Sequence, residues 1–335
     1  MVKAKTWILK KHFDGFPKES NFELKEEVLP ELQDGDVLVE AVYLSLDPYM
    51  KSVHKQKQFI SPYKYLNLLS GRVVKSKDPA FPEGCYVVAN CGWRTHSVIT
   101  AKGPARPIMT RIVSEWPSDI SMSLALGSLG MPGLTGLYGL EEVCKIQSGE
   151  TILVSAAAGA VGAMVGQICK IKGCKVVGSA GGDDKVAYLK ELGFDQAFNY
   201  KTVPSLEEAL KNASPEGYDC YFESVGGPFF TAALKNMKPG GRIAVCGAIA
   251  TYNDTTPQMC PYPHHEIITR QLKIEGFMVS SWQHKDEESV KRMLKWMKEG
   301  KLKAKEVVTV GFENMPAVFI RMLKGDGLGK AIVKV

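Results

Sequence analysis

The stretch over residues 151–185, TILVSAAAGAVGAMVGQICKIKGCKVVGSAGGDDK, constrains the fold more than any other part of the sequence. An apolar run at 151–155 is typical of a buried strand, and a turn of small residues follows it. A helical apolar pattern over 160–172 then leads into a second strand-like run at 175–179. A strand, a helix and a second strand in this order form a βαβ unit, so we expect a parallel sheet here.

The same alternation continues beyond this unit. Further strands are predicted near 196–199, 218–223, 242–246 and 274–279, and further helices near 184–192, 205–212 and 229–236. Alternating strands and helices predict an α/β domain, a doubly wound parallel sheet with helices on both faces.

The two ends of the chain have a different pattern. The first 125 residues contain short β-like runs broken by turn residues, such as DVLVEAVYLSLDPYM and EGCYVVANCGW, which indicate a compact β-rich domain. After the helical pattern EESVKRMLKWMKEG, the chain closes with a strand, a helix and a strand, and we expect these to return to the first domain. The predicted division is 1–125 completed by 300–335, and 126–299, which suits a chain of 335 residues.

Composition excludes several classes of protein. The net charge of +6 is mild and its Lys and Arg residues are scattered, so we expect no nucleic-acid partner, although an anionic ligand is favoured. No apolar run reaches the ~18 residues that cross a bilayer, and MVKAKTWILKKHF has no signal-peptide pattern, so we expect no membrane insertion and a cytoplasmic location. The 8 cysteines form no Cys-x2-Cys pair and are interpreted as reduced.

The turn at 156–162, AAAGAVG, resembles the dinucleotide fingerprint G-x-G-x-x-G. Ala157 takes the place of the first glycine, while Gly159 and Gly162 keep the other two. Gly159 would let the backbone approach a pyrophosphate, and Gly162 would let the helix pack closely on the sheet. A small-residue turn that binds nothing is the alternative, and the surrounding αβ series favours the dinucleotide.

The second strand of the unit indicates which dinucleotide is bound. It ends in Ser-Ala-Gly-Gly, without the carboxylate that holds the ribose 2′-hydroxyl of NAD, and Lys185 follows where it can pair with a 2′-phosphate. Asp183 and Asp184 argue against this, but they come later and suit the first turn of a helix. The pattern therefore favours NADP(H). Tyr200 would lie against the same phosphate or the adenine, or simply pack.

Two later strand ends, CYFESVGG and AVCGAIATYN, predict the nicotinamide side. Tyr252 in the second could donate to a carbonyl oxygen, or only anchor its loop. Tyr49 in SLDPYM could face a cleft between the domains, or pack on the β-rich domain. No Gly-His-Glu segment occurs, so no catalytic metal is expected. Reduction of an activated C=C bond needs only a hydrogen-bond donor for the developing enolate.

Segments along the whole chain carry a family resemblance: KTWILKKHF, SLDPYM, ALGSLGMPGLTGLYGL, AAAGAVGAMVGQI, KVAYLKELGF, FNYKTV, PEGYDCYF, VCGAIATYN and GFENMPAVFIRMLKGD. The chain resembles the zinc-free branch of the medium-chain dehydrogenase/reductase superfamily, and within it the NADPH-dependent prostaglandin and 2-alkenal reductases. That resemblance implies a GroES-like catalytic domain beside the Rossmann domain, and homodimers joined edge to edge through their Rossmann sheets. It implies reduction of the C=C bond of enone lipid mediators, such as 15-oxo-prostaglandins, and of 2-alkenals, with leukotriene B4 12-hydroxydehydrogenase activity as a further option.

The resemblance also implies a site. The pyrophosphate would be bound by Gly159, Ala160, Val161 and Gly162, the 2′-phosphate by Lys185 and Tyr200, and the nicotinamide side by Cys246, Gly247, Ala248, Ile249, Ala250, Thr251, Tyr252, Phe277, Met278 and Val279. Tyr252 and Tyr49 would face the substrate carbonyl, and Tyr252, with the ribose hydroxyl of the cofactor, would stabilise the enolate.

The chain departs from this family at three places. Ser224 and Gly327 stand where the family commonly has a cofactor-binding Asn, and residues 51–72 diverge most. These departures keep two alternatives open: a quinone reductase of the same superfamily, and a catalytically silent NADPH-binding protein.

Overall fold

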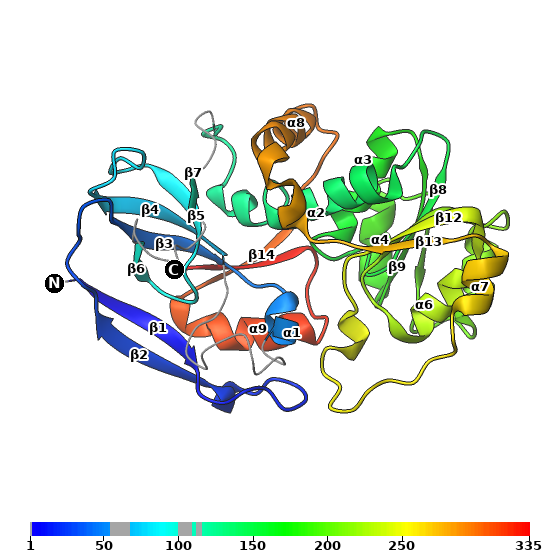
Figure 1. The fold of residues 1–335 in the computed structure, drawn as a ribbon, viewed down its shortest axis with the longest axis horizontal. Coiled ribbons are helices and arrows are strands. Elements are labelled where there is room, and N and C mark those ends of the chain that lie inside the picture. Colours follow the sequence, from blue (N-terminus) through cyan, green and yellow to red (C-terminus); the bar gives the residue numbers. More distant parts are fainter. Residues whose placement is uncertain (1, 54–67, 100–108, 112–115) are drawn as a thin grey trace. The chain divides into compact units, whose positions relative to one another are not determined.

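The computed structural model describes residues 2–53, 68–99, 109–111 and 116–335. The chain divides into two compact units, one of Met1–Gly127 with Glu306–Val335 and the other of Ser128–Lys305 (Figure 1). The boundaries lie a few residues after the predicted ones, and the first unit takes in both ends of the chain.

Strands dominate the first unit. They are β1 (Lys3–Leu9), β2 (Phe22–Val28), β3 (Val37–Ser45), β4 (Leu68–Ser76), β5 (Tyr86–Asn90), β6 (His96–Ile99), β7 (Met109–Arg111), β14 (Glu306–Val310) and β15 (Lys330–Lys334). Its helices are η1 (Glu19–Asn21), α1 (Tyr49–Val53), η2 (Met122–Leu126), η6 (Phe312–Asn314) and α9 (Met315–Leu323). β1 and β2 form an antiparallel pair, and the main sheet has the order β14-β15-β3-β4-β5-β7 with β6 on β3. Because β15 pairs antiparallel with β3, the end of the chain is part of this sheet.

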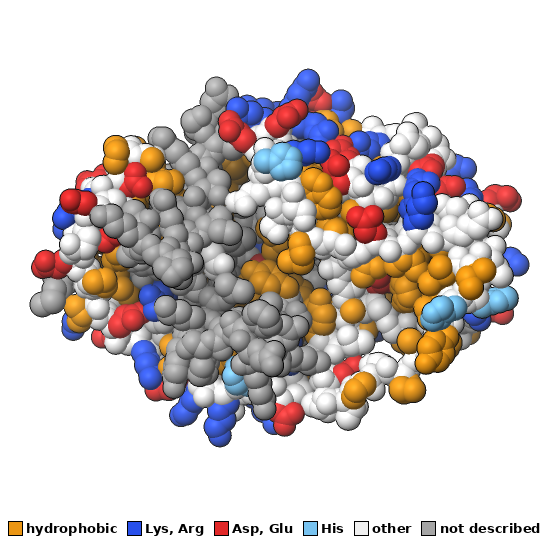
Figure 2. Space-filling view, viewed as in Figure 1, with side chains coloured by type: hydrophobic (Ala, Val, Ile, Leu, Met, Phe, Trp, Pro, Cys, Tyr) orange, Lys and Arg blue, Asp and Glu red, His pale blue; other side chains and the backbone are white. Residues whose placement is uncertain are grey.

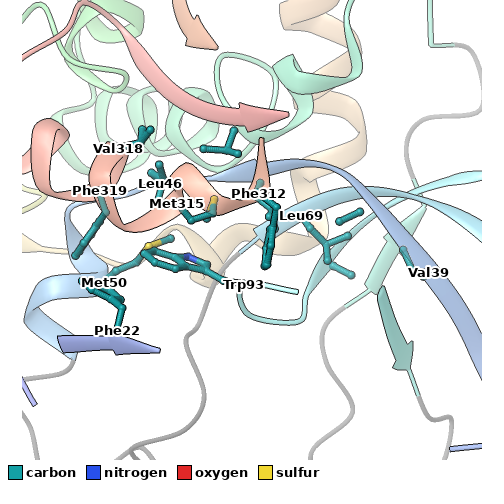
Figure 3. Close-up of a cluster of buried hydrophobic side chains, with 14 of the residues drawn as sticks. Phe22, Val39, Leu46, Met50, Leu69, Trp93, Phe312, Met315, Val318 and Phe319 are labelled. Carbon is teal, nitrogen blue, oxygen red and sulfur yellow. The ribbon is translucent and has the colours of Figure 1, made fainter. Parts of the chain in front are cut away.

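The core of the first unit is a cluster of buried hydrophobic side chains that includes several packed aromatic rings (Figure 3). The rings of Phe22 and Trp93 stack with centroids 5.5 Å apart. Phe319 of α9 lies edge-on to Trp93 at 5.7 Å. Edge-on and offset aromatic pairs add to the stability gained from burial alone. The core therefore joins residues that are far apart in the sequence.

The second unit is built on one parallel sheet (Figure 1). Its strands are β8 (Thr151–Val154), β9 (Lys175–Ala180), β10 (Gln196–Asn199), β11 (Tyr218–Glu223), β12 (Met237–Val245) and β13 (Lys273–Gly276). Its helices are α2 (Met131–Tyr138), η3 (Gly139–Cys144), α3 (Gly162–Ile171), α4 (Asp183–Glu191), α5 (Leu206–Ala213), α6 (Gly227–Leu234), η4 (Ile249–Thr251), α7 (His264–Thr269), η5 (Val279–Lys285) and α8 (Asp286–Lys298). The order β10-β9-β8-β11-β12-β13 reverses direction between β8 and β11. This is a doubly wound sheet, and ligands bind where the order reverses. The predicted fold class is confirmed.

Several predicted elements have other bounds in the structure; for example, the strand expected over 242–246 begins at Met237. The helix expected from 160 begins at Gly162, because residues 156–161 form a turn. The strand expected over 274–279 ends at Gly276, since Phe277 packs edge-on against Phe222, with ring centroids 6.1 Å apart, and a 3-10 helix follows.

The helical segment of α2 and η3 was not predicted, because its sequence MPGLTGLYGL is rich in glycine, which disfavours isolated helices. Here close packing requires a glycine. A Cβ atom at Gly139 would lie 2.5 Å from the ring of Phe222.

Candidate cofactor and active site

The turn after β8 brings the start of α3 to the carboxyl end of the sheet. The Ala157 N–H donates to the carbonyl oxygen of Ser179 on β9 at 2.9 Å, and the Gly159 N–H donates to Ala156 at 3.0 Å. A Cβ atom at Gly162 would lie 2.6 Å from the Ala156 carbonyl oxygen, so only glycine fits at the first position of α3. This close packing of helix on turn is the role the fingerprint assigns to its last glycine, and the turn fits a pyrophosphate.

Just after β9, the side chains of Tyr200 and Lys201 lie over the backbone of Gly181. A Cβ atom at Gly181 would lie 3.0 Å from the Tyr200 hydroxyl and 3.0 Å from Cε of Lys201. Tyr200 is 42% exposed, so much of its surface is open to a ligand. Lys185 is the third residue of α4, and its side chain lies near the neighbouring glycine, Gly182. Lys201 was not singled out from the sequence, although it directly follows Tyr200 there.

The two acidic residues near this strand end belong to α4. Asp183 and Asp184 lie in the first turn of α4, where a carboxylate interacts favourably with the helix dipole. The side-chain amide of Asn199 donates to Asp183 Oδ1 at 2.8 Å. The Asp184 carboxylate folds back over Gly182. The strand end itself carries no acid, which fits a phosphorylated ribose.

A buried carboxylate organises the end of β11. Glu223 is 1% exposed and accepts the Gly226 N–H at 2.7 Å, together with the Val225 N–H and the Tyr221 hydroxyl. Burial raises the pKa of Glu223, although these donors lower it in part. The hydroxyl of Ser155 accepts the N–H of the residue after Glu223 at 2.9 Å, which ties the ends of β8 and β11 together. Neither Glu223 nor Ser155 was predicted as a site residue. The only signal in the sequence was the charge of Glu223 at the end of an apolar strand, and Ser155 had none.

The loops after β11 and β12 are joined by backbone hydrogen bonds. The Ile249 N–H donates to the Ser224 carbonyl at 3.1 Å, and the Ala250 N–H donates to Val225 at 3.0 Å. Burial raises the pKa of the Cys246 thiol to about 11, although the neighbouring Ser224 hydroxyl lowers it in part. The structure therefore brings Ser224 together with residues 246–250, all of them predicted for the nicotinamide side.

Tyr252 lies over the backbone at the end of β12. Its hydroxyl oxygen is 2.9 Å from the position of a Cβ atom at Gly247 and 3.5 Å from the Ala248 nitrogen, whose N–H it accepts. Burial raises the pKa of Tyr252, so the phenol is protonated at neutral pH. Because it accepts one hydrogen bond, its own proton remains available for a substrate oxygen.

The three residues after β13 have different environments. Phe277 is held between Phe222 and Trp282, with ring centroids 6.1 Å and 6.0 Å away. Met278 is 70% exposed, and Val279 begins η5. These residues follow β13, which pairs with β12 in parallel. Because parallel strands have their carboxyl ends at the same edge of a sheet, the three residues lie at the same edge as Tyr252.

Comparisons with known proteins agree with this geometry. Residues 5–106 match the family model described as the N-terminal domain of oxidoreductase, and residues 160–299 match that of zinc-binding dehydrogenase. The chain is 54% identical to prostaglandin reductase 1 of Mus musculus over 337 residues, which cover 100% of both chains. It is 39% identical to the NADP-dependent 2-alkenal reductase of Nicotiana tabacum, covering 100% of this chain and 98% of the relative. The crystal structure of CurA from Vibrio vulnificus in complex with NADPH superposes with a TM-score of 0.89 at 33% identity, covering 99% of each chain.

This chain belongs to the prostaglandin reductase family of the medium-chain dehydrogenases/reductases. Two of the predicted site residues, Tyr49 and Gly327, lie in its first unit. Tyr49 begins α1 and packs against the aromatic core, and burial with the charge of Asp47 raises the pKa of its phenol. Asp47 in turn accepts a hydrogen bond from the buried ammonium of Lys330 at 2.6 Å.

Gly327, a departure from the family pattern, has a φ of 120°. This conformation strongly favours glycine in the loop before β15. Of the other departure, residues 51–72, the part over 54–67 lies outside the described residues.

For this member of the prostaglandin reductase family, three further observations concern the described residues. Among them, no group of three or more His, Cys, Asp or Glu side chains is placed to hold a metal ion. None of the helices in the described ranges is both long and apolar enough to cross a membrane. The cysteines are all free, and Cys144, Cys169, Cys174 and Cys220 are buried.

Proposed function

We propose that this protein is an NADPH-dependent reductase of the C=C bond of α,β-unsaturated ketones and aldehydes, with 15-oxo-prostaglandins and 2-alkenals as substrates. One observation carries the substrate class: the full-length identity of 54% to a prostaglandin reductase. The strand ends of the second unit supply the matching chemistry, namely a glycine-rich turn, cations beside a carboxylate-free strand end and a neutral phenol. Leukotriene B4 12-hydroxydehydrogenase activity is the corresponding oxidative option for a lipid mediator.

Each part of the site has a task in this reaction. The turn at 156–162 binds the pyrophosphate, and Lys185 with Tyr200 binds the 2′-phosphate. Ser224, residues 246–252 and residues 277–279 surround the nicotinamide and its ribose, and Gly327 is proposed as a further contact of the cofactor. When bound, NADPH supplies the hydride that is added to the β-carbon of the substrate.

The protein itself supplies the hydrogen-bond donor. As hydride reaches the β-carbon, negative charge develops on the carbonyl oxygen of the substrate, and a donor placed there lowers the barrier. Tyr252 has its hydroxyl proton available, and its raised pKa keeps it neutral. Tyr49 is proposed to orient the same carbonyl. No step requires a metal ion.

Steady-state kinetics of the purified protein test this proposal. NADPH oxidation is followed with 15-oxo-prostaglandin, a series of 2-alkenals and ortho-quinones as substrates. Turnover of the enones supports the proposal. Turnover of quinones alone would assign the protein to the quinone reductases, and cofactor binding without any turnover would make it a silent NADPH-binding protein.

We further propose that the protein is a cytoplasmic homodimer joined through β13. This strand is at the edge of its sheet, and Ile274 on it and Ile268 on α7 are 36% and 71% exposed. Figure 2 shows hydrophobic side chains gathered over the region of α7. If two copies of β13 pair antiparallel about Ile274, Lys273 of each copy faces Glu275 of the other, which is a self-complementary contact. Free cysteines fit a reducing compartment.

Light scattering during size-exclusion chromatography tests the dimer. Wild type is expected at twice the chain mass of 36.8 kDa, and Ile274→Lys at the mass of one chain. Val308→Lys, at a similarly exposed residue of the first unit, is the matched control and keeps the wild-type mass. A wild type that elutes as one chain contradicts the proposal.

A further inference from the structure

Asn199 lies at the last position of β10, directly opposite Ala180, the last residue of β9. The two ends of its side-chain amide point to different elements. Its nitrogen donates to Asp183 Oδ1 on α4 at 2.8 Å, and its oxygen accepts the Lys201 N–H at 3.1 Å. One side chain therefore connects the start of α4 to the turn that follows β10.

The hydrogen bond from Asn199 fixes the position of the Asp183 carboxylate and so of its negative charge. Asp183 comes three residues after the end of β9, near the place where NAD-dependent Rossmann domains carry the acid that binds the ribose hydroxyls. A carboxylate that turned toward this place would repel a 2′-phosphate and attract an unphosphorylated ribose. The amide of Asn199 holds the carboxylate between α4 and β10 instead.

The bond to Lys201 shapes the turn that carries the cation. The Asn199 carbonyl also accepts the N–H and the hydroxyl of Thr202, each at 3.2 Å. In this turn, Tyr200 and Lys201 both reach 3.0 Å from the Cβ position of Gly181. Asn199 thus positions Tyr200 and Lys201 at the adenosine end of the site, while it holds the Asp183 carboxylate away from it.

We propose that Asn199 is a positioning residue for cofactor selectivity, which holds Asp183 away from the ribose 2′ position and sets Lys201 beside it. This inference rests on the proposed NADPH-dependent function. Asn199 acts through its neighbours, so its loss changes the preference for the phosphorylated adenosine more than the affinity for adenosine itself.

Isothermal titration calorimetry of the full chain with adenosine 2′,5′-bisphosphate and with 5′-AMP tests the proposal, since these probes differ only by the 2′-phosphate. Asn199→Ala is expected to lower the preference for the bisphosphate about three- to fivefold, the size of one partly screened charge interaction. Asn199→Asp keeps an acceptor for the Lys201 N–H but repels Asp183, and is expected to lower the preference further. Asn212→Ala, an exposed asparagine on α5, is the matched control and leaves the preference unchanged.

A double-mutant cycle separates positioning from a general structural effect. If Asn199 acts through Asp183, Asn199→Ala changes the preference less in an Asp183→Ala background than in wild type. An equal loss for both probes, or an undiminished effect in the Asp183→Ala background, would overturn the inference. Because Asn199→Asp is measured as well, poor folding of one variant does not decide the result. A wild type that binds both probes equally would instead contradict the proposed NADPH dependence.

Discussion

The two ends of the candidate cofactor site are built in opposite ways. At the adenosine end, Tyr200 is 42% exposed, and Asp183 and Lys201 are exposed as well. At the nicotinamide end, Glu223 and Ser155 are 1% and 0% exposed. Water screens each charge at the first end, so each contact there is weak and selectivity is the sum of several. At the second end a lost contact leaves a buried group without a partner, which costs more.

The largest effect is expected at the buried end. Glu223→Ala removes the acceptor of the Gly226 N–H and of two further donors, so it should lower the free energy of unfolding by about 3 kcal/mol or more. Urea unfolding measures this change. Glu208→Ala, at an exposed carboxylate on α5, is the control and should change stability by less than about 0.5 kcal/mol. Equal losses for the two variants would contradict the role of burial.

The pH dependence of this loss follows from the raised pKa of Glu223. Its folded-state pKa lies above the usual value of 4.5, so its favourable contribution is fully present below that pH and is lost as pH rises through the folded-state pKa. The stability difference between wild type and Glu223→Ala should therefore be largest in acid and shrink toward neutral pH. A difference that grows with pH would show that the folded-state pKa is lowered instead.

The second-largest effect, on kcat, is expected from Tyr252 at the nicotinamide end of the site. Tyr252→Phe removes one donor to the developing enolate and should lower kcat about 100-fold. Tyr262→Phe, at a tyrosine 88% exposed, should leave kcat unchanged. Because the pKa of Tyr252 is raised, the wild-type kcat should not fall through neutral pH on account of this group. An unchanged kcat in Tyr252→Phe would leave this side chain with a packing role only.

A smaller and more selective effect is expected at the exposed end. Lys185→Ala should raise KM for NADPH about tenfold and leave KM for NADH nearly unchanged, since only the 2′-phosphate loses a partner. Lys190→Ala, on the same helix α4, is the control and should change neither value. If both cofactors lose affinity equally, Lys185 does not bind the 2′-phosphate.

The smallest effect is expected in the turn at 156–162, which lies between the adenosine and nicotinamide ends of the site. Ala156 has a φ of 49°, a left-handed conformation that glycine adopts at lower cost. Ala156→Gly should therefore stabilise the protein by about 0.5–1 kcal/mol in thermal or urea unfolding. Ala160→Gly, in the same turn at a residue without positive φ, should give no such gain. Destabilisation by Ala156→Gly would mean that local contacts of the methyl group outweigh the strain.

Much of the fold follows from the sequence, because buried parallel strands have a clear pattern. The run YDCYFE predicts a strand and is β11, and the alternation around it predicts the doubly wound sheet. The helix α2 could not be predicted in the same way, since its glycines are selected by packing partners such as Val165 and Met293, which are distant in the sequence.

The candidate site follows from the sequence only in part. The turn around Gly159 and Gly162 has a motif, and Lys185 follows from the missing acid. Asn199, Lys201 and Glu223 have no motif, because their contacts arise where neighbouring strands end in space. Such convergence depends on the strand order, which the local pattern does not contain.

The way in which β14 and β15 complete the first unit has a consequence for synthesis on the ribosome. The second unit, Ser128–Lys305, is one continuous segment and can fold as soon as it has emerged. The first unit cannot, because β3 pairs with β15, which is translated after the whole of the second unit. The Met1–Gly127 segment must therefore wait until Glu306–Val335 has been translated, and during this time a nascent hydrophobic surface that includes Trp93 is exposed to chaperones.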